Sequence, residues 1–200
     1  MENQNGMNLL ETLGGGCQLL LSAPHAHDHR RPSLSASIKQ AEPWTDHIVR
    51  VASSDLDAFA MMQQGECPYD PNYHREEDNA YKRKMREFVK ENKLKYFVDV
   101  HGLSDIHNYD VAIYYPIRYG RSRRLADGVA KALDQKELVD LTVHIYNFSP
   151  GLQETLTEFA VYELGITGIQ IEVARYIRED SDLRASLINN LESYLSVLEF

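Results

Sequence analysis

LLLSAPH at residues 19–25 and YFVDVH at residues 96–101 are two short apolar runs that each end in a histidine. Runs of this length and composition predict buried β-strands. In an open α/β sheet the carboxyl ends of the strands form the crevice where ligands bind, so two such strands would bring His25 and His101 to one place. Because carboxylates lie near both histidines in the sequence, the pattern indicates a metal site.

Alternating strands and helices are expected along the rest of the chain. The expected strands cover residues 17–23, 95–100, 110–115, 141–146 and 168–173. Apolar residues recur with helical spacing around 81–89, 125–133 and 183–198, the last with Asp180 or Ser181 as its N-cap. This alternation predicts a single domain over residues 1–200, a three-layer α/β/α sandwich with a mostly parallel or mixed sheet.

The composition favours an ordinary globular protein, with 43% hydrophobic and 26% charged residues among 200. A net charge of -9 argues against nucleic-acid or anionic-membrane partners, which need basic surfaces. Cys17 and Cys67 form no C-x-x-C pair, and the first residues resemble neither an export signal nor a membrane span. We therefore expect a cytoplasmic protein that acts on a small molecule, and the sequence leaves open whether it forms a homo-oligomer.

Two irregular stretches, 26–38 and 63–74, are long enough to be functional loops. The first carries His27 and His29, which compete with His25 as ligands, and we expect at most one or two of the three histidines to bind the same ion. A solvated polar loop is the alternative. The second holds the turn YDPNYHR at residues 69–75, which is either a purely structural turn or a substrate-binding loop.

The acidic metal ligand is either Asp28, three residues after His25, or Glu42, expected at the start of the next helix. Sequence spacing leaves this choice open. Asp99 shares the side of its strand with His101 and would orient the imidazole, and Gly102 would let the chain turn away.

Glu172 lies within the apolar strand QIEVAR at residues 170–175, where an ionised carboxylate is costly unless it is paired or near a metal. Near a metal-activated water, Glu172 would accept a proton and pass it to the leaving amine. The alternative is an ion pair between Glu172 and Arg175.

Five blocks in this order resemble the N-formylglutamate amidohydrolase family, which is related in fold to the zinc carboxypeptidases and aspartoacylases. The blocks lie at residues 22–25, 42–46, 70–72, 99–101 and 170–175, and the resemblance covers about residues 19–178. It implies a phosphorylase/hydrolase-like fold and one Zn²⁺ ion held by His25, Glu42 and His101, with Glu172 as catalytic acid/base and Arg175 as a substrate or oxyanion contact. A carboxypeptidase-like spacing would select Asp28 instead.

One departure from the family pattern concerns the substrate. The family commonly has Asp-Leu-Asn-Arg where this chain has Asp-Pro-Asn-Tyr at residues 70–73, so the basic residue is missing. Arg75, or Arg31 from the histidine loop, would then supply the positive charge beside Asn72 for a substrate carboxylate. The sequence predicts a zinc-dependent amidohydrolase acting on N-acyl amino acid-type bonds. The alternatives are a carboxypeptidase-like peptidase and a non-catalytic ligand-binding module on the same fold.

Overall fold

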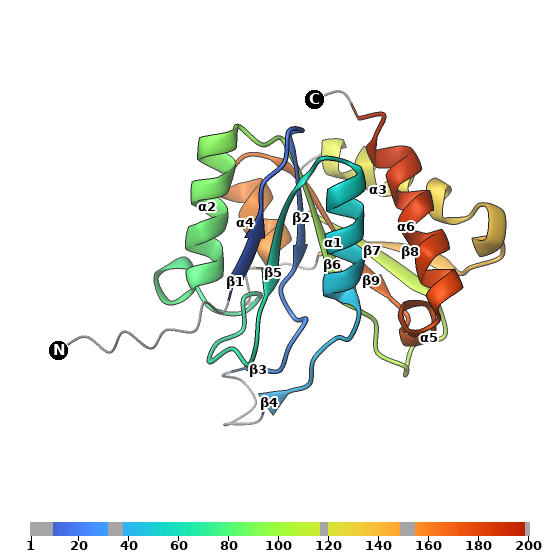
Figure 1. Cartoon of the computed structure of the whole chain (residues 1–200), viewed down its shortest axis with the longest axis horizontal. Coiled ribbons are helices and arrows are strands. Elements are labelled where there is room, and N and C mark those ends of the chain that lie inside the picture. The colour runs from blue at the N-terminus through green and yellow to red at the C-terminus, as the bar shows by residue number, and fades with distance from the viewer. Residues whose placement is uncertain (1–9, 32–37, 117–119, 149–154, 199–200) are drawn as a thin grey trace.

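The computed structural model describes residues 10–31, 38–116, 120–148 and 155–198, and a seven-stranded mixed sheet forms its centre (Figure 1). The strand order across the sheet is β1 (Leu10–Leu13), β5 (Phe59–Gln63), β2 (Leu19–Ala23), β6 (Tyr96–Gly102), β9 (Thr167–Val173), β7 (Val111–Tyr115) and β8 (Val143–Asn147). The four strands β5, β2, β6 and β9 are mutually parallel, whereas β1 and β7 run antiparallel to their neighbours β5 and β9. A separate antiparallel ribbon pairs β3 (His29–Arg30) with β4 (Ile38–Lys39).

Helices cover both faces of the sheet, which confirms the predicted α/β/α sandwich (Figure 1). The first face carries α1 (Thr45–Asp55), α3 (Gly120–Leu133) and α6 (Ser181–Leu195), and the second carries α2 (Ala80–Asn92) and α4 (Leu156–Tyr162). Short helical segments complete the chain: η2 (Glu76–Asp78), η3 (Lys136–Leu138) and α5 (Arg175–Glu179). Within β2, Leu19 and Leu21 pack into the first core and Leu20 into the second, so this strand is buried on both sides.

All five expected strands are present, with ends shifted by up to two residues, and Asp180 is the N-cap of α6. Sequence reasoning missed β1 and β5, and it treated residues 26–38 as wholly irregular although β3 lies within them. Residues 32–37 lie outside the described ranges. No helix in the described part of the chain is long and apolar enough to cross a membrane.

β6 ends at Gly102, so the chain leaves the sheet directly after this residue, but the backbone there does not have the positive φ that favours glycine. A Cβ atom at Gly102 would lie 2.8 Å from Nη2 of Arg178 and 3.0 Å from Cβ of Glu42. Glycine is therefore required at this position for close packing rather than for a turn.

Candidate metal centre

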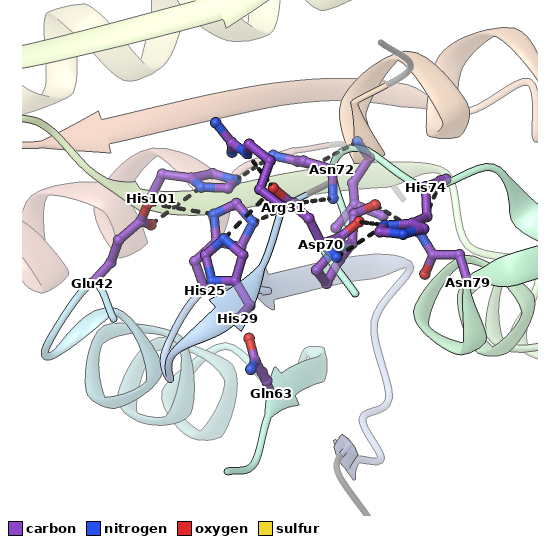
Figure 2. Close-up of polar contacts among 12 residues, drawn as sticks. His25, His29, Arg31, Glu42, Gln63, Asp70, Asn72, His74, Asn79 and His101 are labelled. Atoms are coloured by element: carbon purple, nitrogen blue, oxygen red, sulfur yellow. Dashed lines mark hydrogen bonds and ion pairs between the residues drawn. The ribbon is translucent and has the colours of Figure 1, made fainter. Parts of the chain in front are cut away.

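The parallel pairing of β2 with β6 brings His25 and His101 together at the carboxyl end of the sheet. Their rings pack edge to face with centroids 4.8 Å apart. The segment that carries Glu42 lies beside His25, because the backbone N–H of Glu42 donates to the carbonyl of His25 at 2.8 Å. One carboxylate oxygen of Glu42 lies 3.3 Å from Nδ1 of His25, and the other lies 3.2 Å from Nδ1 of His101 (Figure 2).

Two buried aspartates fix the orientation of both imidazoles. Nε2 of His25 lies 2.9 Å from Oδ1 of Asp70, and Nε2 of His101 lies 2.9 Å from Oδ2 of Asp99. An ionised carboxylate can only accept a hydrogen bond, so each Nε2 is placed to donate to its aspartate, and each Nδ1 faces Glu42, where it can carry a proton or bind a metal ion. Nδ1 of His25 is buried and has no hydrogen-bond donor among the described residues.

The residues fit a divalent cation. The ligand atoms of His25, Glu42 and His101 lie within 4.8 Å of one another, and all three residues are buried or half-buried. Two imidazole nitrogens and one carboxylate form the donor set of a catalytic zinc site, which keeps its fourth position open. Because the Glu42 carboxylate faces both Nδ1 atoms, either protons on the imidazoles or a bound cation can balance its charge.

The pKa values reflect the same demand for positive charge. Burial alone would raise the pKa of Glu42, but the two imidazoles hold it well below its usual range. Burial alone would lower the pKa of His101, but Asp99 and Glu42 together raise it well above its usual range.

A second group of potential ligands consists of His25, His29 and Asp70. His29 stacks on His25 with ring centroids 4.0 Å apart, and its Nε2 lies 3.6 Å from Oδ2 of Asp70. The same Asp70 oxygen already accepts a hydrogen bond from Nε of Arg31 at 2.6 Å (Figure 2). This guanidinium balances the charge of Asp70 and repels a further cation, so the Glu42 group is the better metal site.

Glu172 lies opposite His101 in the register of β9 with β6, and both line one cleft of about 250 Å³. Nε2 of Gln170 donates to Oε1 of Glu172 at 2.9 Å. Burial raises the pKa of Glu172, although the nearby His101 offsets part of the shift. A half-buried carboxyl group with a raised pKa beside a candidate metal site is suited to exchange protons with a substrate.

The other predicted site residues are divided between this cleft and its surroundings. Arg31 and Asn72 line the cleft. Arg175 is exposed, donates to Glu179 at 2.7 Å and lines an adjoining cavity of about 450 Å³. Arg75 is exposed at the start of η2 and is not among the residues that line either cavity.

The structure brings Glu42, and not Asp28, to the histidines. The Asp28 side chain is exposed, and its Oδ1 accepts a hydrogen bond from the backbone N–H of Ala41 at 2.7 Å. His27 likewise belongs to neither ligand group in the described residues.

Sequence reasoning missed a buried arginine that holds the Glu42 loop. Nε of Arg178 donates to the carbonyl of Val173 at 3.0 Å, and its Nη1 donates to the carbonyl of Pro43. These bonds join the end of β9 to the residue after Glu42.

A second arginine, Arg184, supports this connection. It donates to the carbonyl of Arg178 and stacks over the ring of Trp44 at 4.2 Å. Trp44 has a φ of 70°, a left-handed conformation that is unfavourable for a bulky residue. The stack therefore stabilises a strained turn that lies between Glu42 and α1.

No protein-family model matches the chain, and no curated protein matches its sequence. Solved structures share its fold. A gene product of Agrobacterium tumefaciens is 13% identical with a TM-score of 0.65, over 94% of this chain and 93% of that one. Succinylglutamate desuccinylase from Vibrio parahaemolyticus is 14% identical with a TM-score of 0.59, over 94% of this chain and 69% of that one.

A metallo-carboxypeptidase from Burkholderia cenocepacia is 11% identical with a TM-score of 0.57, over 94% of this chain and 60% of that one. N-acetylmuramoyl-L-alanine amidases also share the fold. The neighbours with a named activity are hydrolases, and at these identities the likeness concerns the fold alone.

Proposed function

We propose that this protein is a zinc-dependent amidohydrolase that cleaves an amide bond in a small N-acyl amino acid. The observation that carries the proposal is the convergence of His25 Nδ1 and His101 Nδ1 on the Glu42 carboxylate, with Glu172 in the same cleft. The sequence resemblance to N-formylglutamate amidohydrolases and the fold shared with a desuccinylase support an amide as the bond that is cleaved.

His25, Glu42 and His101 would hold the ion. A zinc ion bound there would act as a Lewis acid and lower the pKa of a water molecule from about 15.7 to about 7. Glu172 would accept a proton from the attacking water and donate it to the leaving nitrogen, and its raised pKa favours the second transfer. Asp70 and Asp99 would keep a proton on each Nε2, so that each Nδ1 is free to bind the ion.

Asn72 and Arg31, which line the cleft, are proposed substrate contacts, and Arg175 in the adjoining cavity is proposed to contact the outer part of the substrate. The free thiols of Cys17 and Cys67 suit a reducing compartment, and we propose the cytoplasm.

Metal analysis and turnover of matched variants test the proposal. We expect purified protein to bind about one zinc ion per chain, and Glu42→Gln to lose this ion. Asp28→Asn is the control, because Asp28 binds only the Ala41 backbone in the described structure. Glu172→Gln should keep the metal and lose turnover by at least about a hundredfold.

The substrate screen compares N-formyl, N-acetyl and N-succinyl amino acids with short peptides, and amine release is measured. Hydrolysis of peptides alone would assign the chain to the carboxypeptidase-like alternative. Binding without turnover, unchanged in Glu172→Gln, would identify a ligand-binding module. Retention of the metal by Glu42→Gln would show that the proposed centre is wrong.

A further inference from the structure

A lysine whose side chain has no partner among the described residues lines the candidate site, and sequence reasoning did not identify it. Lys39 lies in β4, opposite His29 of β3, and its side chain is half-buried. It lines both the cleft that contains Glu172 and the adjoining larger cavity. The two cavities have Lys39, Glu42, Gly102 and Ser104 in common, so Lys39 lies where they meet.

The arginines around the two cavities are already engaged. Arg31 binds Asp70, Arg175 binds Glu179, and Arg178 binds the carbonyls of Val173 and Pro43. The Lys39 ammonium group makes no hydrogen bond or ion pair with any of the residues that the structure describes, which separates it from these three arginines. A half-buried ammonium group without a partner is poised to bind an anion from solution.

Lys39 is also close enough to act on the catalytic machinery. Burial raises the pKa of Glu172, and the positive charge of Lys39 offsets a small part of that rise. An anion bound by Lys39 would therefore lie within reach of the metal centre and of Glu172. In a chain with a net charge of -9, the ammonium group also offsets the general repulsion of an anionic substrate.

We propose that Lys39 is the residue that binds the substrate carboxylate and so selects N-acyl amino acids over their uncharged analogues. The inference rests on the proposed function, which supplies the amide to be cleaved. With the carboxylate on Lys39 at the junction, the acyl amide lies in the Glu172 cleft and the amino-acid side chain has the larger cavity available. Lys39 would act in binding and selection, and Glu172 in proton transfer.

Equilibrium binding tests this role separately from turnover. The probes are the N-acetyl derivatives of alanine, glutamate and phenylalanine, each compared with its uncharged α-carboxamide. Calorimetric titrations use zinc-loaded protein in a Glu172→Gln background, so that binding is read whether or not the chain is an amidase. A charged hydrogen bond to a carboxylate predicts roughly tenfold to hundredfold tighter binding of the acids than of the carboxamides.

We expect Lys39→Gln to abolish this preference and Lys39→Arg to retain most of it. Lys131→Gln is the matched control, because Lys131 is exposed on α3 and lines neither cavity. The proposal is overturned if the Lys39→Gln variant keeps the preference for the acids. It is also overturned if protein that retains Lys39 binds the acid and the carboxamide equally, or binds neither. Failure to hydrolyse any acid that binds through Lys39 would instead contradict the proposed function.

Discussion

Replacement of Arg178 by lysine tests whether the buried guanidinium holds the metal-binding loop in place. Arg178 is only 3% exposed and donates to two backbone carbonyls, those of Val173 and Pro43. The lysine ammonium keeps the charge but is a single point donor, so it can reach one of these carbonyls and not both.

The expected loss follows from the bond that lysine cannot make. A hydrogen bond from a charged donor contributes about 1.5–3 kcal/mol, and a buried carbonyl left without a partner adds to the loss. We therefore expect Arg178→Lys to lower the free energy of unfolding by about 2–3 kcal/mol. Because Pro43 follows Glu42 directly, the loosened loop should also weaken zinc binding, by about tenfold for each 1.4 kcal/mol of coupling.

Urea unfolding of metal-free protein, followed by circular dichroism, measures the stability, and competition with a chelator measures zinc affinity. Arg175→Lys is the control, because Arg175 is exposed and solvent screens its ion pair with Glu179. If Arg178→Lys changes the free energy of unfolding by no more than Arg175→Lys does, Arg178 does not hold the Glu42 loop in place. Lower stability with unchanged zinc affinity would refute the link to Glu42.

Two further substitutions test the packing and the electrostatics. Gly102→Ala places a Cβ atom 2.8 Å from Arg178 and 3.0 Å from Cβ of Glu42, so thermal unfolding and chelator competition should show a loss of about 1–3 kcal/mol in stability together with weaker zinc binding. Wild-type stability in this variant would show that the contact relaxes freely. Burial, and then Asp55, raise the pKa of Glu192 from 4.5 to about 7, so the folded state binds more protons and loses stability as the pH rises from about 4.5 to about 7. Glu192→Gln should therefore gain roughly 1–2 kcal/mol in urea unfolding at pH 8, after allowance for solvent screening, and almost nothing at pH 4; an equal gain at both pH values would contradict this.

Local patterns were enough to predict the fold class and the position of the histidines. The runs that end at His25 and His101 are short, apolar and bounded, so each predicts a strand without knowledge of the rest of the chain. β5 was missed because Phe59–Gln63 holds alanine, methionine and glutamine instead of β-branched residues. Its place between β1 and β2 depends on tertiary pairing, which overrides local preference.

The choice between Asp28 and Glu42 could not be made from spacing because it depends on how the chain folds back between them. His29 pairs with Lys39 in the two-stranded ribbon of β3 and β4, and the backbone N–H of Ala41 donates to the Asp28 carboxylate. The next residue, Glu42, then faces the histidines. These two contacts join residues 10 and 13 positions apart, and no local pattern encodes them.

The buried aspartates decide what the centre can hold. By accepting from each Nε2, Asp70 and Asp99 orient both Nδ1 atoms toward the Glu42 carboxylate. Such a buried group of carboxylates is stable only when protons on the imidazoles or a bound cation balance its charge, and apolar side chains of similar volume would stabilise the fold at least as well. A purely structural role therefore does not account for these residues. The grouping is suited to a site that binds a cation, and under the proposed function Glu172 in the same cleft would supply the proton transfer that hydrolysis requires.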